Sequence, residues 1–147
     1  MDRDRTTALL AHAGVIPFIA CTLMISFQIE TVIVGLSWLD ILLSYSLVII
    51  SFMSGVHWGQ SLDLDQRWSS QLFIMSNICS LSAWFSYLLL SQKLALLLHA
   101  LIFCLLWLID RNLKHSKCIS THYYLLRRRI SVIVVTCLLS QTLVIAN

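Results

Sequence analysis

The sequence predicts an all-α integral membrane protein, a bundle of five transmembrane helices with its N-terminus in the cytoplasm and its C-terminus outside. Three observations predict this fold. Hydrophobic residues make up 59% of the 147 residues, and charged residues make up only 12%, about half the ~25% of ordinary globular chains. The charges are clustered, which leaves five apolar stretches of nearly spanning length. The basic residues between these stretches fall almost entirely on one side.

The five apolar stretches are expected to form a single transmembrane domain over residues 1–147. A helix needs ~20 mostly apolar residues to cross ~30 Å of hydrocarbon. The predicted spans are residues 8–27, 38–58, 71–90, 94–109 and 130–146, each to within a few residues. The last two are short, so we expect flanking side chains to snorkel or the bilayer to thin around them.

The first segment could pass for a signal peptide, because charged residues 1–5 precede an apolar run. No convincing small-residue cleavage site follows, and Pro17 interrupts the run. We therefore expect a retained first helix, kinked at Pro17 because proline deletes a backbone donor in mid-helix.

The second segment has a start signal and a stripe of small residues. Ser37 stands where an N-cap is expected, with Asp40 in the capping-box position three residues later. Ser51, Gly55 and Gly59 repeat at a spacing of four and are predicted to be helix-packing residues, because such a stripe lets another helix backbone approach closely.

The later segments complete the topology. The turn at residues 91–93 is so short that the third and fourth helices must be antiparallel neighbours. With five helices, one side of the membrane collects nine basic residues and the other only Lys93. The nine are Arg3, Arg5, Arg67, Arg111, Lys114, Lys117, Arg127, Arg128 and Arg129. This asymmetry places the N-terminus in the cytoplasm and Asn147 outside, with the matrix replacing the cytoplasm in a mitochondrion. Trp38, Trp58 and Trp68 fall near the predicted interfaces, as an aromatic belt requires.

Several kinds of site are not predicted. The five cysteines include no CxxC pair, which leaves no sign of a zinc or redox site. The sequence contains no HExxH, no GxSxG, no close carboxylate pair and no glycine-rich phosphate loop. We therefore name no catalytic residue, no metal ligand and no cofactor, and we favour a non-enzymatic role. No nucleic-acid motif is present, and the run at residues 127–129 is interpreted as an anchor facing anionic lipid headgroups.

Ionisable residues at membrane depth are expensive and mark candidate sites. The predicted topology brings several polar and aromatic residues toward the cytoplasmic leaflet, as candidates for binding a ligand or partner. They are His12, His57, Trp58, Asp110, Arg111, Tyr124 and Arg127. Structural roles stay open for them: His57 as a helix C-terminal residue, His12 in an interhelical hydrogen bond, and residues 110–111 as a snorkelling pair. His99 is expected to have a satisfied or interfacial role, and Asn77 is expected to form a hydrogen bond between helices.

The run of residues 51–59, SFMSGVHWG, together with Tyr45, resembles the signature of an uncharacterised family of small multi-pass membrane proteins. The likeness extends over most of the chain, to residues 14–18, Trp84, residues 110–111 and residues 124–127. Ser54 departs from it, since a second glycine is expected there. The resemblance implies a bacterial inner-membrane protein, with a related animal mitochondrial transmembrane protein. It singles out His57, Trp58 and Gly59 and implies no substrate.

Three functions follow from these observations. The favoured one is a multi-pass protein of the inner (plasma) membrane that binds a lipid or a membrane-protein partner, or a second copy, through the cytoplasmic-side polar cluster. The second is a small oligomeric ion or proton transporter or channel, for which five helices are few. The third is a quinone- or haem-binding redox protein with His12, His57 and Trp58 around the ligand.

Overall fold

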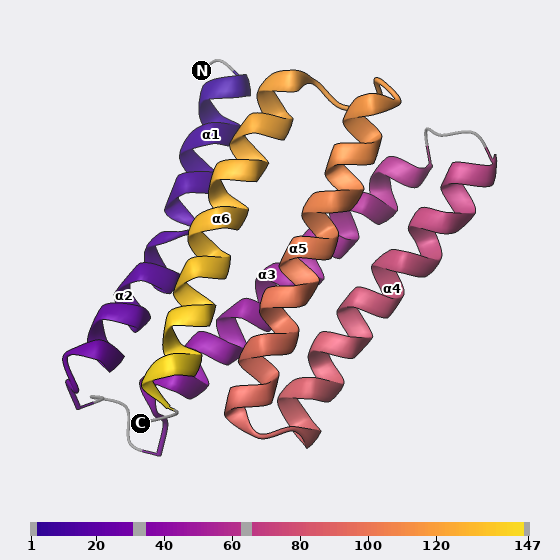
Figure 1. The fold of residues 1–147 in the computed structure, drawn as a ribbon. Coiled ribbons are helices and arrows are strands. Elements are labelled where there is room, and N and C mark those ends of the chain that lie inside the picture. Colours follow the sequence, from indigo (N-terminus) through magenta and orange to yellow (C-terminus); the bar gives the residue numbers. More distant parts are fainter. Residues whose placement is uncertain (1–2, 31–34, 63–65, 146–147) are drawn as a thin grey trace.

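The computed structural model describes residues 3–30, 35–62 and 66–145, and these residues form helices and no strand. The helices are α1 (Arg3–Ala13), α2 (Ile16–Ser26), α3 (Trp38–Ser61), α4 (Gln66–Leu89), α5 (Gln92–His115) and α6 (Thr121–Val144). They lie side by side in one bundle (Figure 1). The N-terminus lies at the same end as the α5–α6 connection, and the C-terminus lies at the opposite end with the α4–α5 connection.

Four stretches of helix are long and apolar enough to cross a membrane: Arg5–Ser26, Trp38–Ser61, Ser69–Leu89 and Gln92–His115. The first of these stretches contains most of α1 and all of α2. Large apolar side chains point outward along the bundle, among them Phe52 and Leu143, which are 66% and 70% exposed. Exposed apolar surface on this scale suits lipid better than water. The prediction of an all-helical, multi-pass membrane protein is thus supported.

Helix α6 is not one of these four stretches. It begins at Thr121, about nine residues before the predicted start, and its early turns carry the arginine run. The Ser120 hydroxyl caps it by accepting a hydrogen bond from the backbone N–H of Tyr123 at 3.2 Å. Helix α5 likewise continues past the predicted end to His115. Hydropathy marks where lipid contact ends, whereas a helix continues to its cap, so both were predicted too short. Residue 146 lies outside the described residues.

The first span is interrupted before the proline rather than bent at it. Helix α1 ends at Ala13, and α2 begins at Ile16 with Pro17 in its first turn. Pro17 has no N–H, and its ring excludes the carbonyl of the residue four positions earlier, so the helix cannot continue unbroken through this point. The Tyr45 hydroxyl of α3 donates to the Gly14 carbonyl at 3.0 Å, which satisfies an acceptor at the break.

The small-residue stripe of α3 lies on the surface. Ser51, Gly55 and Gly59 are all exposed. A Cβ built at Gly55 or Gly59 would meet no atom of another described segment within 4 Å. Within this chain, therefore, no described helix uses the stripe for close approach, and its packing role stays a prediction for a partner.

The capping box at the start of α3 is present as predicted. The Ser37 hydroxyl accepts from the backbone N–H of Asp40 at 3.1 Å, and the Asp40 carboxylate accepts from the backbone N–H of Ser37 at 3.0 Å. The same carboxylate accepts from Gln92 at 2.8 Å. This last bond ties the start of α3 to the start of α5, so these two parallel helices begin at the same level.

A second tie joins α3, α4 and α5 inside the bundle. His99 is fully buried, and its Nε2–H donates to the carbonyl of Ala83 at 3.1 Å. Its Nδ1 is hydrogen-bonded to the hydroxyl of Ser46. Both ring nitrogens are thus used between helices, which agrees with the satisfied role predicted for His99.

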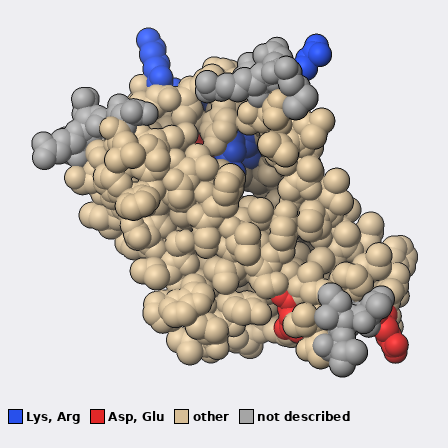
Figure 2. Space-filling model, turned by 180° about the vertical axis from the view of Figure 1, so that it is seen from behind, with Lys and Arg blue, Asp and Glu red and all other residues tan. Residues whose placement is uncertain are grey.

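Charge is divided between the two ends of the bundle (Figure 2). The basic residues at the start of α1, at the end of α5 and in the early turns of α6 lie at the end that holds the N-terminus (Figure 1). Glu30, Asp40 and Lys93 lie at the other end. The side chains of Arg3, Arg67 and Trp68 lie outside the described part of the chain. We call the first end the basic end.

Tyr45→Phe should lower the thermal unfolding midpoint in detergent by about 2–4 °C, because the partly buried Gly14 carbonyl loses a bond that contributes about 1 kcal/mol. Tyr87→Phe is the matched control, since the Tyr87 hydroxyl makes no hydrogen bond to a described residue. Equal effects of the two changes would contradict a tie at the helix break.

Candidate functional site

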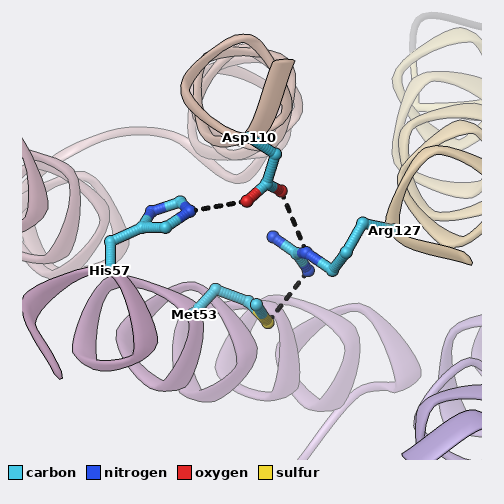
Figure 3. Close-up of polar contacts among 4 residues, drawn as sticks. All are labelled: Met53, His57, Asp110 and Arg127. Carbon is cyan, nitrogen blue, oxygen red and sulfur yellow. Dashed lines mark hydrogen bonds and ion pairs between the residues drawn. The ribbon is translucent and has the colours of Figure 1, made fainter. Parts of the chain in front are cut away.

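Three helices contribute one ionisable side chain each to a buried cluster near the basic end (Figure 3). His57 of α3 donates from Nε2 to Oδ1 of Asp110 in α5 at 2.8 Å. Arg127 of α6 donates from Nε to Oδ2 of the same carboxylate at 3.0 Å. Asp110 thus stands between the other two, and each of its oxygens has a charged or polar donor. We call these residues the His–Asp–Arg cluster.

Local structure explains why the three side chains meet. His57 and Asp110 lie four and five residues before the ends of α3 and α5, which run in the same direction and so end at the same level. Arg127 lies in the second turn of α6, which begins at that end. Helix α6 packs along both α5 and α2. A residue near each of these helix ends therefore reaches the same depth.

The cluster is almost completely buried. His57 and Asp110 are fully buried, and Arg127 is 7% exposed. An isolated ionised carboxylate would be very costly there, so its neutralisation by Arg127 is required. Because carboxylate oxygens only accept hydrogen bonds, the contact with His57 needs a proton on Nε2. With a neutral imidazole the cluster carries no net charge.

The cluster leaves hydrogen-bonding capacity unused. Arg127 also donates from Nη1 to the sulfur of Met53 at 2.9 Å, a weak acceptor (Figure 3). Arg127 Nη2 and His57 Nδ1 are buried and have no partner among the described residues. Unpaired buried polar groups are costly, and each needs an explanation such as a ligand or water. Here two of them belong to one cluster.

An apolar groove of about 440 Å³ runs beside the cluster and is lined by residues of α1, α2, α3 and α6 and by Phe103 of α5. Arg127 is the one basic residue in its described lining, and most of the other lining residues are apolar. They include Leu10, Phe18, Phe52, Met53, Ile130 and Val134. Figure 2 shows a hollow toward the basic end with basic atoms inside it. The groove therefore offers a long apolar wall and one guanidinium.

A second, more polar hollow of about 400 Å³ adjoins the groove. The two share Thr7, Val56, Tyr123 and Leu126 in their linings. The second hollow adds Gln60, Ser120 and His122, which lie at or close to the basic end. Gln60 Oε1 is buried without a partner among the described residues. Together the hollows lead from the polar end of the bundle to its apolar flank.

The structure brings together three of the seven predicted binding residues, His57, Asp110 and Arg127. His12 is exposed, and its Nδ1–H donates to the carbonyl of Ala8 in its own helix at 2.7 Å. Arg111 is exposed. Whether any of the seven binds a ligand stays a prediction.

The remaining two predicted residues have other contacts. Trp58 is 54% exposed and packs edge-on against Phe73 of α4, with 5.6 Å between ring centroids. Tyr124 is buried, and the Lys114 ammonium lies 4.7 Å from its ring centroid. Both aromatic rings therefore pack between neighbouring helices, and neither is hydrogen-bonded to the His–Asp–Arg cluster.

Met53, Gln60 and Tyr123 were not among the predicted binding residues. Met53 lies one turn before His57 on the same face of α3, so helical periodicity could have placed it beside the cluster. Gln60 and Tyr123 could be placed only once the true helix ends were known. Gln60 follows the predicted end of its helix, and Tyr123 precedes the predicted start of its helix.

The described residues include no group of three or more His, Cys, Asp or Glu side chains placed to hold a metal ion. The His–Asp–Arg cluster supplies only two such side chains, His57 and Asp110, and Arg127 binds the second carboxylate oxygen of Asp110. Its geometry is that of an ion pair extended by a histidine.

Residues 4–143 match the model of a family described as "Protein of unknown function (DUF3429)". The chain belongs to this family. The match includes all three members of the His–Asp–Arg cluster and every described helix except the ends of the first and last. The predicted membership of an uncharacterised family is therefore confirmed. Comparison with curated proteins and with solved structures gives no match.

Asp110→Ala should destabilise the protein by about 3–5 kcal/mol, because it leaves the Arg127 guanidinium buried without its counter-charge. Replacing both partners, in Asp110→Leu with Arg127→Leu, should recover most of this loss, since apolar side chains can substitute for a buried ion pair. Chemical unfolding in detergent micelles measures both. A double variant no more stable than Asp110→Ala would show that the pair matters for something other than mutual neutralisation.

Proposed function

We propose that this family member is a non-enzymatic membrane protein that binds an anionic amphiphile, with its acyl chain in the α1–α2–α3–α6 groove and its headgroup at Arg127. The observation that carries the proposal is the unpartnered Nη2 of Arg127, a residue that also lines an apolar groove. An oxygen of a carboxylate or phosphate would supply the missing acceptor. The apolar walls would hold the chain.

The dimensions and depth of the groove suit such a molecule. Small-molecule sites commonly enclose about 300–1,000 Å³ and combine apolar walls with a few polar groups, and this groove has about 440 Å³. The neighbouring hollow with Gln60, Ser120 and His122 would give the headgroup contact with water. Asp110 would keep Arg127 in position, as a positioning residue that the ligand does not touch.

The cluster also favours an anion over a cation or a neutral ligand. Asp110 already has one donor on each oxygen, so it offers little to a cation. Arg127 has donors left over. This difference is the reason to prefer the lipid-binding function to the ion or proton transport and quinone alternatives.

We further propose that the protein lies in the inner (plasma) membrane with five spans, α6 being the fifth, and with the basic end in the cytoplasm. Cationic residues favour the cytoplasmic side of a membrane, and apart from Lys93 the described basic residues lie at one end of the bundle (Figure 2). The groove would then receive its ligand from the cytoplasmic leaflet.

Native mass spectrometry of the detergent-purified protein should detect bound phosphatidylglycerol at concentrations where phosphatidylcholine does not bind. Ile130→Trp should weaken that binding by about tenfold or more, because an indole would fill the groove and remove a contact energy of about 1.4 kcal/mol. Ile133→Trp is the matched control, an exposed position three residues along the same helix and outside the groove lining.

A parallel titration with oleate separates carboxylate from phosphate recognition, since both anions fit the same donor. Binding that is equal for anionic and zwitterionic lipids, or equal in the two tryptophan variants, would contradict the proposed site.

Reporter fusions test the topology. A reporter that is active only in the cytoplasm should work at the N-terminus and fail at the C-terminus, and one that is active only outside should behave in the opposite way, because five spans put the termini on opposite sides. Activity of the same reporter at both termini would mean that the protein has an even number of spans.

A further inference from the structure

A separate groove of about 160 Å³ lies on the outer face of the bundle between α3 and α4. Its chemistry differs from that of the apolar groove beside Arg127. Its lining is small and polar: Ser51, Ser54 and Gly55 of α3, with Ser76, Asn77 and Ser80 of α4. Trp58 closes it toward the basic end. None of these side chains is charged. The groove lies well inside two of the stretches that are apolar enough to span a membrane.

The hydrogen bonds of this groove are incomplete. The Ser54 hydroxyl is buried, with only 3% of the residue exposed, and has no partner among the described residues. Asn77 is exposed and donates through Nδ2 to the carbonyl of Phe73 in its own helix at 2.7 Å. A primary amide has a second N–H and a carbonyl oxygen to offer. Acyl chains can satisfy neither the amide nor the hydroxyl.

The shape of the groove points to a helix rather than to a lipid. At about 160 Å³ it is smaller than common small-molecule sites, and its lining includes Ser51 and Gly55 of the stripe that Gly59 continues. Nothing in another described segment lies within 4 Å of a Cβ built on either glycine. Stripes of small residues at a spacing of four let two transmembrane helices approach to backbone contact. Serine and asparagine side chains then form hydrogen bonds across that contact.

We propose that this face binds a second copy of the chain, with α3 crossing α3 at Gly55 around a twofold axis. A twofold contact must be self-complementary, since the same residues meet from both sides. Hydroxyl and amide groups meet this condition because each both donates and accepts, and the absence of charge among the lining residues removes repulsion between copies. The copies would complete the hydrogen bonds that Ser54 and Asn77 lack.

Oxidative cross-linking in native membranes tests the proposal. The background carries Cys104→Ala and Cys118→Ala, which remove the two exposed cysteines. In this background Ser51→Cys should give a disulfide-linked dimer. Val132→Cys, which replaces an exposed residue of α6, is the control for random collision and should give little.

Adding Gly55→Leu to Ser51→Cys should reduce the dimer about tenfold, because the leucine side chain separates the two helices. The chain itself should still fold, since the added side chain enters open space, and an unchanged thermal midpoint would verify this. Equal cross-linking at positions 51 and 132, or a yield that Gly55→Leu leaves unchanged, would overturn the proposal. So would a Ser51→Cys cross-link made only to a different protein. The binding of phosphatidylglycerol does not enter this test, so either proposal can fail alone.

Discussion

Asp110 places a carboxylate where neither water nor lipid can stabilise its charge, and the rest of the bundle is arranged around that constraint. One oxygen is bound to His57 and the other to Arg127, so α3, α5 and α6 are held at one level. His57 lies eleven residues after Ser46, and Asp110 lies eleven residues after His99. Eleven residues make about three turns, so the two ties fall on the same faces of α3 and α5. They fix the register of these parallel helices at two depths.

Lipid as a solvent explains why these few polar contacts matter so much. Apolar side chains gain little by exchanging lipid for protein, so the burial of hydrophobic surface cannot by itself select one arrangement of helices. Large side chains such as Phe52 and Leu143 remain outside. Specific hydrogen bonds, such as that from Tyr45 to the Gly14 carbonyl at the helix break, distinguish the native packing from other arrangements.

The sequence alone was enough for the fold class, the four long apolar spans and the Ser37–Asp40 cap, because hydropathy and capping are local. It was not enough for helix ends beyond the hydrocarbon. The polar residues that start α6 gave no hydropathy signal, so Tyr123 was placed in a loop. The candidate site could be predicted in part, because the topology brought His57, Asp110 and Arg127 to one end of the bundle. Which neighbour turned inward depended on helix rotation, and so Arg111, next to Asp110, proved exposed while Arg127 proved buried.

Helix α3 has two faces with different roles, one packed inside the bundle and one exposed. Its inward face repeats Ser46, Ile50, Met53 and His57, which carry the contacts to α5 and α6. Its outward face carries the stripe with Gly55 at its centre. The run of residues 51–59 that supports the family resemblance alternates between these faces, so packing inside the chain accounts for only part of it. Two outward glycines in a helix cost stability relative to alanine. No described neighbour packs against these glycines, so nothing within a single chain offsets this loss of helix stability. Close packing of another helix against them would offset it.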